Sequence, residues 1–346
     1  MNRVYLDHNA TTPLRMEARS AMIAAMDVVG NPSSVHAEGR AAKAIVERAR
    51  ARISNALGAA GADIVFTSSA TEAAALACAG RELQGSAIEH DAVRSWIREV
   101  LPVDGRGRVS VTDPETSVVQ LANSETGIIQ DLPQGLALSD LTQAFGKVPF
   151  GFDWLGVDMG LISAHKLGGP KGVGALVIRQ GLDLPAQIRG GGQEMGRRAG
   201  TENVIGIAGF GAAAEAAQQD VAGGNWRQTE KLRNILESAL ADVSNTTIFV
   251  GKDCNRLPNT SCFATPGWKG ETQVMQMDLA GFAISAGSAC SSGKVKASTV
   301  LTAMGLGDMA ASAIRVSLGL ETTEDDVLRF VEVWAQKLKK HETRAA

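Results

Sequence analysis

The chain has 346 residues, of which 45% are hydrophobic and 21% are charged, as is usual for a soluble globular protein. Its formal net charge of −3 argues against nucleic acid or an anionic membrane as the main partner. No apolar run approaches the roughly 20 residues of a membrane-spanning helix, and the first residues, MNRVYLDHNATTP, lack the apolar stretch of a signal peptide. We therefore expect a cytoplasmic protein.

Hydrophobic periodicity predicts helices that alternate with buried strands. A helix is predicted over residues 37–57, ending at Gly58. Its apolar stripe consists of Ala41, Ile45, Ala49 and Ile53. A second helix is predicted over residues 71–83, and buried strands over residues 63–67, 117–123, 156–163 and 172–179. This alternation predicts a largely parallel sheet with helices on both faces.

The character of the chain changes in its last third. Residues 203–241 predict two consecutive helices, interrupted near Gly223 and Gly224. Short strands over residues 247–250, 262–265 and 314–319 are then interleaved with helices, and the last helix begins at a capping box of Thr323 and Asp326. We expect a large domain over residues 15–220 and a smaller domain of residues 1–14 plus 221–346.

The strongest local signal is SAHKLGGPKGVGAL (163–176), in which a buried strand runs directly into His165, Lys166 and a glycine-rich loop. The end of a strand in an α/β sheet is where ligands bind. A lysine there becomes a nucleophile when burial and neighbouring cations favour its neutral amine. The alternative is a surface lysine in a turn.

Asp140 ends another apolar strand, and Gln143 follows three residues later. A carboxylate in this position suits pyridoxal phosphate (PLP), whose pyridine nitrogen needs an acidic partner to stay protonated. Gln143 would then hydrogen-bond the phenolic oxygen of the ring. The alternative for Asp140 is a helix cap.

Two further motifs suit the same cofactor. FTSSATEAA (66–74) predicts a strand, a small polar turn and a helix N-terminus near Thr71, which would cradle a phosphate group. His90 follows a short strand and suits a ring that stacks on a cofactor and moves protons, or else a capping residue.

The four cysteines lack CxxC spacing, so no zinc knuckle or dithiol motif is expected. Cys78 falls in a predicted helix and Cys262 in a predicted strand, so both are expected to be packing residues. Cys254 is expected to be exposed and to have no role in the chemistry. Cys290 lies in SAGSACSSGK, whose small polar residues predict an accessible, reactive thiol.

Taken together, these motifs resemble those of the cysteine desulfurases, in the class-V aminotransferase branch of the PLP enzymes. The resemblance runs nearly end to end through YLDHNATTP (5–13), GNPSSVHAEGR (30–40), FTSSATEA (66–73), EHDAV (89–93), NSETG (123–127), DLTQAFGK (140–147), SAHKLGGPKG (163–172), RGGGQEMGRRAGTEN (189–203), SAGSACSSG (285–293) and IRVSLG (314–319). It implies the fold-type I PLP-transferase fold: an α/β protein with a large domain on a mainly parallel central sheet and a smaller α+β domain.

The resemblance also implies roles for individual residues. Lys166 would hold the cofactor, His90 would stack on its ring, and Asp140 and Gln143 would bind its pyridine nitrogen and phenolic oxygen. The other implied cofactor ligands are Ala70, Thr71, Ser124, Ser163, His165 and, from the partner subunit of a homodimer, Thr201. Arg315 would bind the carboxylate of L-cysteine with help from Asn31. No metal is implied.

Cys290 would accept the sulfur as a persulfide and pass it to an acceptor or iron–sulfur scaffold protein, leaving L-alanine. A selenocysteine lyase, a cysteine-sulfinate lyase and a class-V aminotransferase would use the same scaffold. A degenerate desulfurase acting as a binding scaffold is a further alternative.

The chain departs from the family pattern in three places. Ser69 replaces a glycine of the phosphate turn, and Ala74 stands at a position that is usually polar. Ser124 replaces an asparagine that commonly approaches the cofactor. The segment between residues 77 and 135 is shorter than usual, so we expect its helices and strands to be trimmed.

Overall fold

The computed structural model describes residues 3–287 and 297–345. Its helices are α1 (Met16–Met26), α2 (Ala37–Leu57), α3 (Ala70–Cys78), α4 (Asp91–Arg94), α5 (Phe152–Leu155), α6 (Val204–Ala222), α7 (Trp226–Val243), α8 (Gly270–Leu279), α9 (Thr299–Ala303) and α10 (Glu324–Ala345). Its strands are β1 (Val4–Tyr5), β2 (Ala62–Thr67), β3 (Leu83–Gly85), β4 (Ile97–Glu99), β5 (Ser139–Asp140), β6 (Met159–Ser163), β7 (Gly174–Arg179), β8 (Ile248–Val250), β9 (Thr260–Ala264), β10 (Phe282–Ala283), β11 (Ser285–Ala286) and β12 (Ala313–Ser317). Among the described helices, none is long and apolar enough to cross a membrane.

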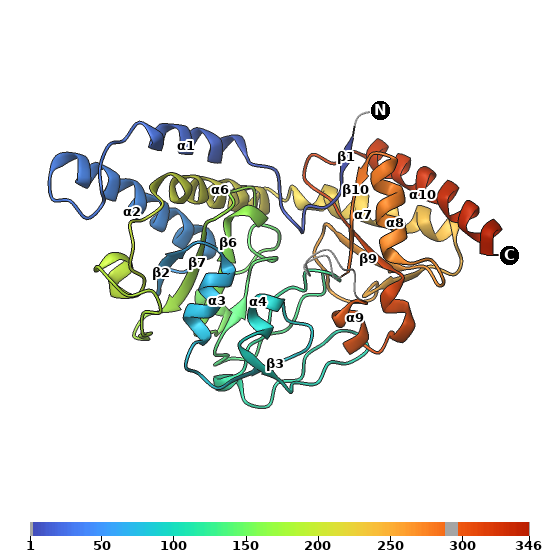
Figure 1. Ribbon diagram of the computed structural model, residues 1–346, viewed down its shortest axis with the longest axis horizontal. Coiled ribbons are helices and arrows are strands. Elements are labelled where there is room, and N and C mark those ends of the chain that lie inside the picture. The colour runs from blue at the N-terminus through green and yellow to red at the C-terminus, as the bar shows by residue number, and fades with distance from the viewer. Residues whose placement is uncertain (1–2, 288–296, 346) are drawn as a thin grey trace.

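The chain forms two parts that lie side by side, and it passes from one to the other between α6 and α7 (Figure 1). The first part is built on a sheet with the strand order β2-β7-β6-β5. Strand β7 is antiparallel to both neighbours, whereas β5 and β6 are parallel. Parallel bridges Val118↔Leu138 and Gln84↔Ser117 continue the sheet to β3 and β4, which are also parallel. Apart from β7, the sheet is therefore parallel, as predicted.

Alternate residues of the central strands pack on opposite faces of this sheet, which is the two-residue period of β structure. Ile64 and Val177 pack on one face, in a core shared with α1, α2 and α6. Val65 and Leu176 pack on the other face, in a core shared with α3. Strand β7 is buried on both faces, which explains why its sequence is a continuous apolar run.

Two predictions about the helices need correction. The buried stripe of α2 consists of Ala42, Val46, Ala49, Ile53 and Leu57, whereas Ala41 is exposed and Ile45 only half-buried. Close contact with α6 sets this orientation, because a side chain on Gly211 would collide with the backbone of Ala49. Helix α3 ends at Cys78, short of the predicted residue 83, because Leu83 already belongs to β3.

Other local predictions are confirmed. Gly58 ends α2 in the left-handed conformation, with φ of 60°. At the start of α10, Thr323 Oγ1 accepts from the Asp326 amide at 3.2 Å, and Asp326 Oδ2 accepts from the Thr323 amide at 3.1 Å. The segment after α3 contains only short elements, because β3, α4 and β4 have three or four residues each; its trimming relative to the family stays a prediction.

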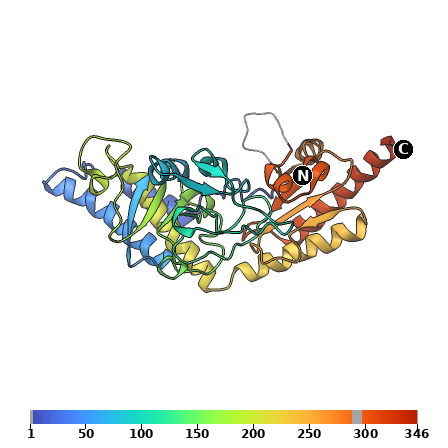
Figure 2. The same ribbon diagram turned by 90° about the horizontal axis from the view of Figure 1, so that it is seen from below.

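The second part is an antiparallel sheet of order β11-β12-β9-β8, packed against α7, α8 and α10. Its core contains the fully buried Trp268 and Trp334 and also includes Val4 and Leu6 from the start of the chain. Strand β1 pairs with β10, so the N-terminus lies among C-terminal elements (Figure 2). We propose that the two cores are separate domains, divided between α6 and α7 as the sequence predicts.

Candidate active site

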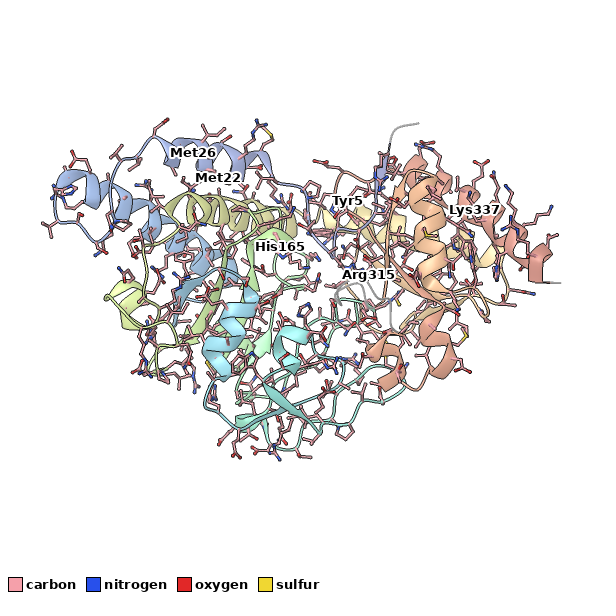
Figure 3. All side chains as sticks on the ribbon, viewed as in Figure 1. Tyr5, Met22, Met26, His165, Arg315 and Lys337 are labelled. Carbon is pink, nitrogen blue, oxygen red and sulfur yellow. The ribbon has the colours of Figure 1, made fainter. Side chains whose placement is uncertain are left out.

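A cavity of about 780 Å³ lies between the two parts of the chain. It is lined by almost all the residues that the sequence predicts as cofactor or substrate ligands: Ala70, Thr71, His90, Ser124, Asp140, Gln143, Ser163, His165, Lys166 and Arg315. His165 comes from the first part and Arg315 from the second, and the two lie near the junction (Figure 3). Residues that are far apart in sequence therefore meet in one concave site.

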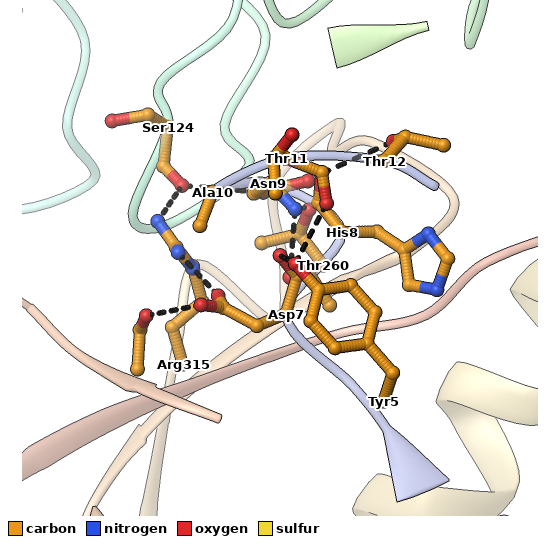
Figure 4. Close-up of polar contacts among 12 residues, drawn as sticks. Tyr5, Asp7, His8, Asn9, Ala10, Thr11, Thr12, Ser124, Thr260 and Arg315 are labelled. Atoms are coloured by element: carbon orange, nitrogen blue, oxygen red, sulfur yellow. Dashed lines mark hydrogen bonds and ion pairs between the residues drawn. The ribbon is translucent and has the colours of Figure 1, made fainter. Parts of the chain in front are cut away.

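Lys166 lies in the single turn that follows β6, where the strand ends at the cavity. Its Nζ donates to the backbone carbonyls of Asn9 and Ala10 at 2.7 and 2.8 Å. The N-terminal segment of the chain therefore holds the amine in place. Figure 4 shows this segment folded beside Arg315.

His165 is half-buried next to Lys166, and its Nδ1 lies 3.1 Å from Thr11 Oγ1. Burial, together with the positive charges of Lys166 and Lys171, lowers the pKa of His165 to about 4. The ring is therefore neutral at physiological pH and contributes hydrogen bonds rather than charge to the site.

Asp140 is the last residue of β5, and Gln143 follows three residues later. Asp140 Oδ1 accepts from the Thr142 amide at 2.9 Å, so the carboxylate caps the turn and also lines the cavity. Gln143 Nε2 donates to the Asn9 carbonyl at 3.0 Å. Asp140 thus combines the capping role with a place in the cavity wall.

The predicted phosphate turn is formed at the start of α3. Ser69 is the N-cap residue, and its φ of −174° is an extended conformation that serine adopts without strain. The amides of Ala70 and Thr71 donate to no group within residues 3–287 and 297–345. A side chain on Gly174 would lie 2.8 Å from the Ala70 nitrogen, so a glycine is needed where β7 passes the turn.

His90 caps the short helix α4, because its Nδ1 accepts from the Ala92 amide at 3.1 Å. It also lines the cavity, so the structural and functional interpretations of this residue are compatible. Since Nδ1 accepts a hydrogen bond, the neutral ring carries its proton on Nε2.

Arg315 is buried at the wall of the cavity between Asp7 and Ser124 (Figure 4). Its Nη2 forms an ion pair with Asp7 Oδ1 at 2.7 Å, and its Nη1 donates to the Ser124 carbonyl at 3.0 Å. The buried Nε has no hydrogen-bond partner within the described part of the chain. Ser124 therefore supports Arg315 through its backbone, a contact that asparagine or serine would make equally.

Two of the predicted site residues, Asn31 and Thr201, do not line this cavity. Asn31 is exposed, and its side chain accepts from the Ser33 amide at 2.9 Å. Thr201 is also exposed, in the loop before α6. Cys290 lies outside the described residues. The roles of these three residues remain predictions.

The other cysteines are placed largely as expected. Cys78 and Cys262 are buried, and burial raises the pKa of the Cys78 thiol to about 12. Cys254 is half-buried rather than exposed, because its Sγ lies 3.6 Å from the Arg106 carbonyl. Of the three described cysteines, none lines the cavity.

Two buried carboxyl groups in the cavity wall were not predicted. Burial, with a smaller contribution from nearby Asp140, raises the pKa of Glu89 to about 8 against the opposing effect of its hydrogen bonds. Burial also raises the pKa of Glu125 to about 7, although its Oε2 accepts from Ser298 Oγ at 2.5 Å. Both residues stand in the motifs EHDAV and NSETG, directly beside residues with predicted roles. Position in those motifs was the signal that could have identified them.

The sequence also gave no role to Asp7, Asn9 or Lys147. Asn9 is almost fully buried and accepts from Lys166 and Gln143 through its backbone carbonyl. Within residues 3–287 and 297–345, no group of three or more His, Cys, Asp and Glu side chains is placed to hold a metal ion.

Comparisons with known proteins identify the family of this chain. The sequence model of the aminotransferase class-V family matches residues 4–97 and 100–330. A cysteine desulfurase from Cereibacter sphaeroides is 41% identical over 96% of this chain and 95% of the relative. The solved structure of a NifS-like protein from Rickettsia africae is 33% identical with a TM-score of 0.89, covering 98% of this chain and 100% of that chain.

A solved structure of SspA in complex with cysteine is also similar, at 27% identity and a TM-score of 0.76, covering 92% of this chain and 100% of that chain. The family match spans most of the chain, and the relatives match it at nearly full length. The chain therefore belongs to the aminotransferase class-V family and, within it, to the cysteine desulfurases.

Proposed function

We propose that this enzyme uses PLP to convert L-cysteine to L-alanine and passes the sulfur to Cys290. The observation that carries the proposal is that Lys166, Asp140 and Arg315 line one cavity between the two parts of the chain. An amine, a carboxylate and a guanidinium are the groups needed to hold the cofactor, to tune its ring and to bind an amino-acid carboxylate.

The residues present fit PLP. The cavity volume of about 780 Å³ lies within the range of about 300–1,000 Å³ that is usual for small-molecule sites. The two amides at the N-terminus of α3 that have no partner among the described residues suit a phosphate group. Thr71, Ser163 and His165 line the same cavity and would add hydrogen bonds to the phosphate.

Each side chain would then have one task. When bound, PLP supplies an electron sink that stabilises negative charge at the α-carbon of the substrate. Lys166 would hold the cofactor and, once displaced, take the α-proton and return it. Asp140 would keep the pyridine nitrogen protonated, and Arg315 would bind the substrate carboxylate. His90 would stack on the ring and move protons through Nε2.

Cys290 would act as the nucleophile toward sulfur. Its thiolate would attack the substrate sulfur, forming a sulfur–sulfur bond while the carbon–sulfur bond breaks. The electrons of the broken bond would remain with the carbon fragment, which leaves as alanine after protonation. Gly287 and Thr299 precede and follow the undescribed segment, and both line the cavity, which supports this role.

We also propose that the enzyme is a cytoplasmic homodimer with shared active sites. Thr201 would reach the phosphate in the partner subunit, which agrees with its exposure in the single chain, and Asn31 would assist substrate binding. Apolar side chains are exposed on α1 and just after it, at Met16, Ile23, Met26, Val29 and Val35. Such a patch suits contact with a second copy. An acceptor or iron–sulfur scaffold protein would collect the sulfur.

The substitutions at Ser69, Ala74 and Ser124 do not favour a degenerate binding protein. Ser69 adopts its conformation without strain, and Ser124 contacts Arg315 through its backbone. Ala74 is fully buried in the core beneath α3 and does not line the cavity. These positions therefore give no reason to expect loss of the cofactor.

The test is to quantify alanine and sulfide released from cysteine and a reductant by wild type, Lys166→Ala and Cys290→Ser. We expect both variants to lose desulfuration, while Cys290→Ser keeps its bound cofactor. Release of sulfide by Cys290→Ser at the wild-type rate would refute the persulfide step. A wild type that releases selenide from selenocysteine but little sulfide from cysteine would favour a selenocysteine lyase instead.

A further inference from the structure

Lys147 is a buried amine behind the wall of the cavity. The residue is only 3% exposed, and it does not line the cavity itself. It forms no ion pair with a carboxylate in the described part of the chain, and its Nζ donates instead to Gln143 Oε1 at 2.7 Å and Asn9 Oδ1 at 3.0 Å. A buried amine without a counter-ion is costly, so its presence calls for an explanation.

The contacts of Lys147 determine how the Gln143 amide is oriented. Both hydrogen bonds of Lys147 use its N–H groups, so the oxygen of Gln143 must face Lys147. On the other side, the Asn9 carbonyl can only accept, so the nitrogen of Gln143 must face Asn9, at 3.0 Å. The two constraints are independent and agree. The amide nitrogen has a second hydrogen, and Gln143 lines the cavity.

The same contacts extend to Lys166. The Asn9 carbonyl that accepts from Gln143 also accepts from Lys166 at 2.7 Å, while the Asn9 side chain accepts from Lys147. Asn9 itself is anchored to the second part of the chain through Thr260 at 2.8 Å and Asn259 at 3.1 Å. Lys147, Gln143 and Lys166 thus share one rigid acceptor residue.

We propose that Lys147 is a positioning residue that holds Gln143 as an N–H donor toward the ring oxygen of the cofactor. This inference rests on the proposed function, because it assigns a donor to the PLP ring. Without Lys147, the Gln143 oxygen loses its donor, and only the Asn9 carbonyl then opposes a turn of the amide. Such a turn would present the oxygen, which would repel a negatively charged ring oxygen. Lys147 therefore acts through Gln143 and makes no contact with substrate.

The surroundings of Lys147 disfavour its positive charge. Burial, Lys166 and Arg315 lower the pKa of its amine well below the usual range. Burial, with a further contribution from Lys147, lowers the pKa of His8 and of His165, each to about 4. The amine donates its hydrogen bonds in either protonation state, so the positioning role does not depend on its charge.

The test is a double-mutant cycle of Lys147→Met, Gln143→Ala and both together, on holoenzyme without substrate. The readout is the pH midpoint at which the visible absorbance of the bound cofactor titrates. An N–H donor stabilises negative charge on the ring oxygen, so its loss raises the affinity of the cofactor for a proton. We expect Lys147→Met to raise the midpoint by about one pH unit, a tenfold change in proton affinity.

Because Lys147 acts through Gln143, the double variant should have the midpoint of Gln143→Ala alone. Shifts that add in the double variant, or an unchanged midpoint in Lys147→Met, would overturn the proposal. Lys171→Met is the matched control, because Lys171 is exposed and also adds positive charge near His165 without contacting Gln143. A shift in this control as large as that of Lys147→Met would assign the effect to charge alone and overturn the positioning role.

If Lys147→Met does not yield folded holoenzyme, the cycle is run with Lys147→Gln, and the same non-additivity with Gln143→Ala is required. Failure of the proposed function has a different outcome, because wild type would then bind no PLP or release no alanine. An active wild type with an additive cycle would overturn only the role of Lys147.

Discussion

Replacing Arg315 with glutamine tests whether this residue binds the substrate carboxylate. In the structure its guanidinium uses Nη2 for Asp7 and Nη1 for the Ser124 carbonyl. The buried Nε has no partner among the described residues. The variant keeps a polar side chain of moderate size but removes the positive charge and the planar fork that suits a carboxylate.

The expected magnitude follows from the hydrogen bonds that the substitution removes. A hydrogen bond to a charged group contributes about 1.5–3 kcal/mol. Removal of a two-point contact to the substrate carboxylate should therefore cost roughly 3 kcal/mol, or about 100-fold in kcat/KM. The variant also removes the ion pair of Asp7, whose side chain is 16% exposed and keeps the hydrogen bond from Ser285 Oγ, so we expect a decrease in folding stability of about 1–3 kcal/mol.

The assay measures alanine formation at several cysteine concentrations, with urea unfolding in parallel. Arg315→Gln combined with Asp7→Asn separates the effect on stability from the effect on substrate binding. The double variant removes the unpaired charge of Asp7 but does not restore a cation that binds the substrate carboxylate. We expect the double variant to recover most of the stability and none of the kcat/KM. Retention of kcat/KM within about threefold by Arg315→Gln, or its recovery in the double variant, would refute this reasoning.

Two further predictions concern the cofactor site and its pH dependence. Gly174→Ala would push a Cβ against the phosphate turn, 2.8 Å from the Ala70 nitrogen, so we expect PLP to dissociate at least about tenfold more readily; equilibrium dialysis measures this, with Gly105→Ala as a control, because a Cβ there would make only an ordinary contact at 3.7 Å from the Met304 carbonyl oxygen. Burial raises the pKa of Glu125 to about 7, above its value of about 4.3 in the unfolded chain. The folded state therefore holds a proton that the unfolded state releases, and this contribution to stability is lost as pH rises from about 4 to 7. The Tm advantage of wild type over Glu125→Gln should shrink across this range, and a constant difference would contradict the prediction.

The fold brings the site together through one segment near the N-terminus. Asn9 contacts Lys166, Gln143 and Lys147 of the first part, and also Asn259 and Thr260 of the second. The two parts therefore share hydrogen bonds at the floor of the cavity. Any movement of one part relative to the other would therefore change the hydrogen bonds that hold the Lys166 amine.

Local features were predictable because their physical causes lie within a few residues. The capping box of Thr323 and Asp326 and the left-handed Gly58 follow from nearest-neighbour backbone chemistry, and both were predicted. The orientation of α2 was predicted one position off at Ala41 and Ile45. The reason is that its buried stripe is set by contact with α6, through Gly211, which lies far away in the sequence.

The motif order of the sequence by itself determined the family, the lysine in the turn after β6 and ten of the residues that line the cavity, because the motifs that carry these residues are local in the sequence. Only the tertiary structure decided what those residues touch. Arg315 and Asp7 are 308 positions apart, and Lys147 and Asn9 are 138 positions apart. The packing of the two cores determines which residues become partners at such separations. Hydrogen bonds and ion pairs act over a few ångströms in space, so the spacing of residues along the chain does not reveal them.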